Sequence, residues 1–126
     1  MAHDSAPEEM RSECLLCRIA KKEIPSSVVY EDGELLAFKD ISPQAPVHVL
    51  IIPKIHCEGL NDLTPEVEKA AAKIPAVAAK LAKEFGIAAS GYRLIANSGA
   101  DAGQTVFHLH FHLLGGKVLG GKLCQG

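Results

Sequence analysis

Three histidines alternate with apolar residues near the C-terminal end of this 126-residue chain, in the segment Val106-Phe107-His108-Leu109-His110-Phe111-His112-Leu113-Leu114. Near neutral pH, imidazole can act as a nucleophile, as a general acid or base, or as a metal ligand. Successive side chains of a β-strand point to opposite faces, so the three imidazoles would share one face and the apolar residues the other. Polar positions on a solvent-facing strand are the simpler interpretation, but threonine or lysine would serve there better than three histidines.

The spacing of the three rings argues against a single metal ion held by all of them. Side chains two residues apart on a strand are separated by about 6.6 Å, which places His108 about 13 Å from His112. Zn–N bonds are only about 2.0–2.1 Å long. An adjacent pair could still chelate a metal, but we expect the three rings to have different functions.

A loop of small and polar residues precedes the histidines, with the sequence Asn97-Ser98-Gly99-Ala100-Asp101-Ala102-Gly103-Gln104-Thr105. Glycines and small residues allow several backbone N–H groups to point at one anion. By itself such a loop is more often a plain turn between two strands. Next to a row of imidazoles, it suggests a phosphate held against a nucleophilic histidine.

The four cysteines include one C-x-x-C pair, Cys14 and Cys17, whereas Cys57 and Cys124 are isolated and receive no role. A domain of this size does not need disulfides, and in an intracellular chain such a pair indicates metal binding or redox chemistry. A thioredoxin-like redox motif would need a βαβ context that this sequence lacks.

The composition indicates one soluble, intracellular domain. The 13 Lys and Arg against 15 Asp and Glu, with 5% aromatic residues and no Trp, argue against a general nucleic-acid binder. No apolar run reaches the roughly 18–20 residues of a membrane span, and the N-terminus lacks a secretion signal. We expect residues 1–12 to form a flexible tail and residues 13–126 to form a single domain.

Two helices and five strands are expected to position the histidines and cysteines. Apolar spacing predicts a short helix from Cys14 to about Lys22 and a long amphipathic helix over 65–85, which Pro75 should kink. The strands are predicted at 28–30, 35–38, 47–52, 92–96 and 106–114. This pattern indicates an α+β domain with a mostly antiparallel five-stranded sheet.

The segment from His108 to Leu114 matches the histidine triad signature, H-x-H-x-H followed by two apolar residues, and the chain resembles the histidine triad (HIT) family. Other segments similar to that family are Ile24-Pro25, Tyr30-Glu31-Asp32, Ala37-Phe38, Asp40-Ile41-Ser42-Pro43-Gln44-Ala45-Pro46 and Ile52-Pro53-Lys54. The resemblance covers about Cys14 to Gly116. The Gly115-Gly116 pair looks more like the histidine triad nucleotide-binding proteins, the purine nucleoside phosphoramidases, than like the dinucleoside polyphosphate hydrolases.

The resemblance implies hydrolysis of the P–N bond of purine nucleoside 5′-phosphoramidates through a nucleotidyl-histidine. In that family the middle histidine attacks the α-phosphate, and the corresponding residue here is His110. His112 would hydrogen-bond the phosphate or the bridging atom and help to protonate the departing amine. His48 would support the nucleophile by hydrogen bonding.

The resemblance also implies a nucleotide-binding set. Gln104 and Thr105 would contact the phosphate and the leaving group, and Gly103 and Asn97 would complete the phosphate cradle. Asp40 would accept hydrogen bonds from the ribose, although an aspartate before Ser-Pro is usually a turn former. The positions that resemble the purine pocket, each of which could equally belong to the core, are Leu15, Leu16, Ile19, Phe38 and Ile41.

The family's metal site corresponds to Cys14, Cys17, His56 and His108, a Cys₂His₂ set that implies structural zinc. A free dithiol or a protein without metal are the alternatives, and no organic cofactor is expected. The resemblance further implies a homodimer whose sheets join, and a cytoplasmic location with the nucleus as a second compartment.

One feature departs from the family pattern. The branch usually ends in a Trp-Pro-Pro-Gly tail that shapes the neighbouring subunit's site, whereas this chain contains no Trp. The departure leaves the leaving-group specificity open. The alternative functions are a dinucleoside polyphosphate hydrolase and a nucleotide-binding or scaffolding protein whose catalysis is incidental.

Overall fold

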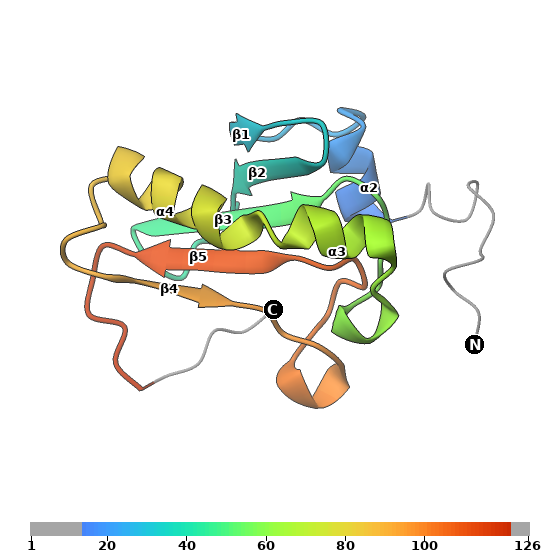
Figure 1. Ribbon diagram of the computed structural model, residues 1–126. Coiled ribbons are helices and arrows are strands. Elements are labelled where there is room, and N and C mark those ends of the chain that lie inside the picture. Colours follow the sequence, from blue (N-terminus) through green and yellow to red (C-terminus); the bar gives the residue numbers. More distant parts are fainter. Residues whose placement is uncertain (1–13, 122–126) are drawn as a thin grey trace.

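The computed structural model describes residues 14–121, so the tail expected over 1–12 and the isolated Cys124 lie outside the described residues. The elements follow one another as α2 (Leu15–Ala20), β1 (Val28–Glu31), β2 (Leu35–Lys39), β3 (Val47–Pro53), η2 (Leu60–Asp62), α3 (Pro65–Ala71), α4 (Ile74–Glu84), β4 (Tyr92–Ile95), η3 (Ala100–Ala102) and β5 (Phe111–Gly115) (Figure 1). Within the described range, no helix is long and apolar enough to cross a membrane.

The five strands form one antiparallel sheet in the order β1-β2-β3-β5-β4. Hairpin-connected strands with one dominant helical segment confirm the α+β fold expected from the sequence. In this order β5 lies between β3 and β4, and His112 pairs with Leu50 on one side and Ile95 on the other. The C-terminal part of the histidine segment therefore occupies an internal strand of the sheet.

The two faces of the sheet carry different layers because side chains alternate along each strand. On one face, α3 and α4 lie across the strands, and Ile74 and Leu81 are fully buried against Ile51 and its neighbours (Figure 1). On the other face, Leu16 and Ile19 of α2 form a smaller buried cluster with residues of β2 and β3. The alternation places His48 and His112 on the face that α2 partly covers.

The helix expected over 65–85 is present but interrupted at Ala72 and Lys73, between α3 and α4. Pro75 lies in the first turn of α4, just after the interruption, where its missing N–H costs no helical hydrogen bond. Lys73, at the interruption, contacts Asp32 Oδ2 and Glu34 Oε1, each at 2.8 Å. These ion pairs attach the helical layer to the turn between β1 and β2.

The strand expected over 106–114 is wrong in its first half, because β5 begins only at Phe111. Its last pairs are Ile51 with Phe111 on one side and Ile95 with His112 on the other. Beyond them Pro53 ends β3 and has no N–H to donate to a continuing ladder. His112 is therefore on the strand, whereas His108 and His110 precede it and can turn in different directions.

Gly115, at the end of β5, allows a close approach of the turn that follows α4. A Cβ added there would lie 2.6 Å from Ile87 Cδ1 and 3.3 Å from the carbonyl oxygen of Gly91, and Ile87 is buried. We expect Gly115→Ala to lower the free energy of unfolding by about 1–3 kcal/mol through overpacking, as measured by urea denaturation. Gly33→Ala is the matched control, because a Cβ at Gly33 meets nothing within 4 Å. Equal losses in the two variants would contradict the packing argument.

Candidate active site

His48 of β3 and His112 of β5 are both buried and form one hydrogen-bonded pair. His48 Nε2 lies 2.8 Å from His112 Nδ1, and the ring centroids are 5.1 Å apart. His48 is therefore hydrogen-bonded to the last histidine of the triad, His112. The family resemblance had implied a hydrogen bond that supports the nucleophile. Asp40 Oδ2 lies 3.6 Å from His48 Nε2, at the edge of the same pair.

His110 is oriented by the backbone of its own segment. Its Nδ1 lies 2.7 Å from the carbonyl oxygen of His108. Because a carbonyl oxygen can only accept, Nδ1 carries the proton and a neutral ring has its lone pair on Nε2. His110 is thus held in the tautomer that a nucleophilic imidazole needs, with the lone pair on the ring nitrogen away from the backbone.

A cavity of about 260 Å³ adjoins His110, and we call it the His110 pocket. The five apolar residues expected around a purine all line it, as does Asp40: the five are Leu15, Leu16, Ile19, Phe38 and Ile41. Leu16 and Phe38 are buried, whereas Ile41 is 97% exposed at the rim. Leu50 and Val106 also line this pocket and were not predicted from the sequence. The alternation of β3 could have identified Leu50, since it shares a face with His48.

The loop from Asn97 to Thr105 is held by the side chain of Gln104. The Gly99 N–H donates to Gln104 Oε1 at 2.8 Å, and Gln104 Nε2 donates to the carbonyl oxygens of Glu58 at 2.7 Å and Val106 at 3.1 Å. Gly103, with φ of 86°, closes the short helix η3 in the left-handed conformation that favours glycine. Gln104 therefore has a clear role inside the loop, and its contact with a phosphate stays a prediction.

The other three residues of this loop that were expected at the phosphate differ in accessibility. Thr105 and Gly103 are exposed, and their contact with a phosphate stays a prediction. Asn97 Nδ2 is buried and has no hydrogen-bond partner within the described part of the chain. A buried amide donor without a partner is uncommon, and a bound ligand would satisfy it.

Cys14, Cys17, His56 and His108 converge from three separate parts of the chain. One potential ligand atom from each lies within 4.8 Å of all the others. His108 Nδ1 is 3.4 Å from both sulfurs, and His56 Nδ1 is 3.2 Å from Cys17 Sγ. Hydrogen bonding from Cys17, whose backbone N–H lies 3.4 Å from Cys14 Sγ, holds the pKa of the Cys14 thiol far below its usual value, against the effect of burial. A thiolate is the form that binds metal.

This cluster fits a tetrahedral ion. Zn–S bonds of about 2.3 Å and Zn–N bonds of about 2.0–2.1 Å give S···N edges of about 3.6 Å in a tetrahedron. The observed S···N distances of 3.2 and 3.4 Å are close to that value. In addition, His108 Nε2 donates to the carbonyl oxygen of Pro53 at 2.8 Å, which leaves the lone pair of a neutral ring on Nδ1, beside the sulfurs. The predicted metal-ligating residues can therefore hold one metal ion.

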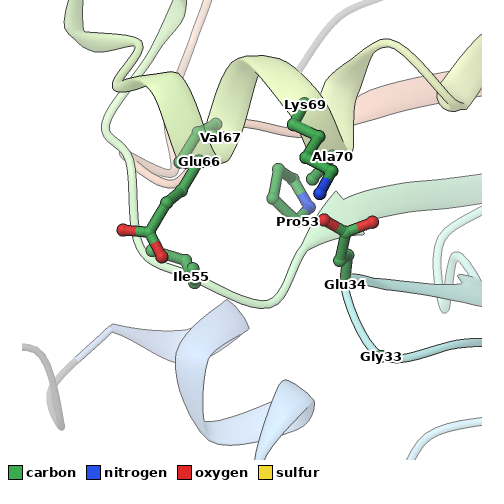
Figure 2. A pocket seen from close by; sticks show the side chains of 8 residues that line it. All are labelled: Gly33, Glu34, Pro53, Ile55, Glu66, Val67, Lys69 and Ala70. Atoms are coloured by element: carbon green, nitrogen blue, oxygen red, sulfur yellow. The ribbon is translucent and has the colours of Figure 1, made fainter.

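A second cavity, of about 230 Å³, lies between the turn of β1 and β2, the end of β3 and helix α3 (Figure 2). It contains none of the residues expected at the active site. Of its two acidic residues, Glu34 and Glu66, Glu34 is already paired with Lys73 at 2.8 Å. The His110 pocket, where an oriented imidazole and a carboxylate meet an apolar wall, is the better candidate for chemistry.

The buried position of His48 predicts a pH-dependent stability. Burial lowers the pKa of His48 from its ordinary 6.5, while Asp40 opposes the shift and His112 is its hydrogen-bond partner. The stabilising contribution is complete above pH 6.5 and is lost as the pH falls through the lowered pKa, because the unfolded chain binds this proton more readily. We expect the urea midpoint to fall between about pH 7.5 and 5.5. The fall should be smaller in His48→Gln, and an identical pH dependence in that variant would contradict the assignment.

This chain matches a known protein family and is similar in sequence to known proteins. The HIT domain family matches residues 21–119. The chain is 50% identical over 116 residues to the purine nucleoside phosphoramidase of Escherichia coli K12, an alignment that covers 92% of this chain and 98% of that protein. It is 45% identical over 105 residues to protein HitA of Neisseria gonorrhoeae, with 83% of this chain and 97% of that protein covered.

Solved structures agree with the sequence relatives. A HIT family hydrolase from Clostridium thermocellum superposes with a TM-score of 0.83 at 50% identity, over 89% of this chain and 97% of that one. A histidine triad protein from Clostridium difficile gives a TM-score of 0.84 at 45% identity, over 90% and 98% of the two chains. The family match begins after Cys14 and Cys17, so the two cysteines that converge with His56 and His108 lie outside the matched range.

Proposed function

The chain belongs to the HIT domain family, and from this premise we propose that it is a hydrolase that cleaves the P–N bond of purine nucleoside 5′-phosphoramidates. The observation that carries the proposal is the orientation of His110, whose Nδ1 is bonded to the carbonyl oxygen of His108 at 2.7 Å beside a pocket suited to a nucleoside. The name of the Escherichia coli relative, a purine nucleoside phosphoramidase, supports the choice of substrate class.

The reaction proceeds in two displacements at phosphorus. Nε2 of His110 forms a bond to the α-phosphorus while the bond from phosphorus to the amine nitrogen breaks. The nitrogen takes up one proton from water and leaves as the amine, and His112 donates a hydrogen bond to the bridging atom or the phosphate. A second water then attacks the phosphorus, the bond to His110 breaks, and the proton lost by this water replaces the one taken up before.

The nucleotide occupies the His110 pocket and the loop beside it. The purine packs between the apolar residues of α2 and those of β2, and the ribose hydroxyls donate to Asp40, whose Oδ1 already accepts from the Ser42 N–H at 2.7 Å. The unpartnered Nδ2 of Asn97 donates to the phosphate, with Gly103, Gln104 and Thr105 completing the cradle. Burial of the rim residue Ile41 by the base would explain why an isoleucine is exposed there.

The metal held by Cys14, Cys17, His56 and His108 is zinc in a structural role. Four protein ligands leave no open position, so the ion supplies cross-linking and no Lewis-acid chemistry. It would connect α2, which forms one wall of the His110 pocket, to the segment that carries the nucleophile.

The protein is a cytoplasmic homodimer in this proposal. β4 forms one edge of the sheet, and its Tyr92 is 40% exposed. Pairing of edge strands would continue the sheet into a second copy, as the family resemblance implies. Light scattering coupled to size-exclusion chromatography tests the dimer.

Mass spectrometry of the intact protein tests the function. The protein is mixed briefly with an adenosine 5′-phosphoramidate and quenched, and we expect a nucleotidyl adduct that peptide mapping locates on His110. Turnover of the phosphoramidate should exceed that of a dinucleoside polyphosphate. Faster cleavage of the dinucleoside polyphosphate would overturn the substrate class, and turnover with no adduct or with the adduct on another residue would overturn the mechanism.

A further inference from the structure

We propose that the backbone N–H of Gln44 is a positioning group of the active site, which fixes the tautomer of His48 and, through it, that of His112. This inference deepens the proposed function and rests on it for its catalytic consequence. The placement of the protons on the two imidazoles follows from the hydrogen bonds alone.

The backbone N–H of Gln44 determines which nitrogen of His48 carries the proton. The N–H of Gln44 lies 3.0 Å from His48 Nδ1 and can only donate, so His48 Nδ1 must present its lone pair. A neutral His48 then carries its proton on Nε2, which lies 2.8 Å from His112 Nδ1. His112 Nδ1 must therefore accept a hydrogen bond from His48 Nε2–H. The proton of a neutral His112 is consequently on its Nε2.

The surroundings of the hydrogen-bonded His48–His112 pair favour the neutral form of both rings. Protonation of His48 at Nδ1 would set an N–H against the N–H of Gln44, and protonation of His112 at Nδ1 would set an N–H against His48 Nε2–H. Burial also lowers the pKa of His48, and Asp40 at 3.6 Å is the group that opposes this effect. His112 therefore meets the substrate as a neutral hydrogen-bond donor through Nε2.

The loop that carries Gln44 is held in place on several sides. Ala45 is buried and packs in a cluster with Leu114, Ile95 and Leu119. A Cβ at Gly116 would lie 3.0 Å from Pro46 Cβ, so the chain after β5 is packed closely against this loop. The N–H of Gln44 is thus presented by a supported backbone segment.

The same assignment distinguishes the two clusters that could hold a metal. Asp40, His48 and His112 also place potential ligand atoms within 4.8 Å of one another. His48 Nε2 carries a proton, however, and cannot ligate a metal. His108, by contrast, donates its Nε2–H to Pro53 and keeps the Nδ1 lone pair for the ion. The first group is a hydrogen-bond relay and the second a metal site.

Nuclear magnetic resonance on the unmodified protein tests the tautomers directly. Long-range ¹H–¹⁵N correlation spectra of the resting, ligand-free protein distinguish Nδ1–H from Nε2–H imidazoles. We expect His48 and His112 as Nε2–H tautomers and His110 as the opposite, Nδ1–H tautomer. An Nδ1–H tautomer at His48 or at His112 would overturn the inference. Because this measurement uses no substrate, its failure is distinguishable from failure of the proposed reaction.

Removal of the single donor tests the catalytic consequence. An ester in place of the backbone amide at Gln44, introduced with the α-hydroxy acid, deletes the N–H without changing a side chain. We expect a mixture of His48 tautomers and a kcat lowered about 10²-fold, with KM changed less than threefold. An ester at Gly91, whose N–H donates to the Ile87 carbonyl at 3.0 Å outside the site, should leave kcat unchanged. Equal kcat losses for the two esters, or none at Gln44, would overturn the positioning role.

Discussion

Replacement of His110 by alanine is expected to reduce turnover of an adenosine 5′-phosphoramidate by at least about 10³-fold, because the covalent route through Nε2 is lost. The Kd for AMP should change only a few-fold, since His110 is one of thirteen residues that line the pocket and the apolar ones from α2, β2 and β3 stay in place. Steady-state kinetics measure the first quantity and isothermal titration calorimetry the second. Full activity in the variant would overturn the assignment of the nucleophile.

Phe107→Ala provides the matched control for this experiment. Phe107 belongs to the same segment before β5, but its side chain is 50% exposed and does not line the His110 pocket. The control should retain both turnover and AMP affinity. Metal content should be measured in both variants, because the His110 ring is hydrogen-bonded to the carbonyl oxygen of His108, a residue of the proposed zinc site.

Local signals in the sequence predicted most of the elements that position the site. The turn at Glu31-Asp32-Gly33 sets the hairpin of β1 and β2, where Asp32 Oδ1 accepts from the N–H groups of Glu34 and Leu35, each at 2.8 Å. Thr64 accepts from the Val67 N–H and begins α3 as its capping position predicts. The resemblance to the histidine triad family is confirmed by the match over 21–119.

The histidine segment was predicted less well because its structure depends on partners distant in sequence. Alternation of apolar residues and histidines from Phe107 to Leu113 favours a strand, but β3 and β4 stop pairing at Ile51 and Ile95. The backbone before Phe111 is instead held by contacts such as the Leu109 N–H bond to the Cys57 carbonyl at 2.6 Å. Those contacts turn His108 toward the cysteines, and no local pattern encodes them.

The roles of backbone groups in the site could not be predicted from the sequence, for a related reason. The resemblance identified His48, but its proton is placed by the N–H of Gln44, a group that every residue except proline possesses. Similarly, Gln104 was expected at the phosphate, and the structure shows its amide bonded to three backbone groups. Side-chain chemistry can be read from residue types, whereas the orientation of that chemistry requires the fold.

Removal of the metal is expected to weaken nucleotide binding as well as stability. In the proposed zinc site, Cys17→Ser or treatment with a strong chelator breaks the link between α2 and the segment before β5. Leu16 and Ile19 of α2 line the His110 pocket, so the Kd for AMP should rise at least tenfold. The loss of metal binding energy should lower Tm by about 10 °C or more. Calorimetry, thermal unfolding and metal analysis measure these effects.

Cys57→Ala separates metal loss from a general effect of replacing a buried cysteine. Cys57, at 1% exposure, is buried as Cys17 is at 4%, and it adjoins His56 in the sequence. Its sulfur donates to the Gly59 carbonyl at 3.2 Å and does not belong to the cluster. The control should keep one metal per chain and the original AMP affinity. The kcat should also fall when the metal is lost, because the His108 carbonyl that orients His110 belongs to a ligand residue. A metal-free protein with unchanged Tm, AMP affinity and kcat would show that the cluster has no structural role in the site.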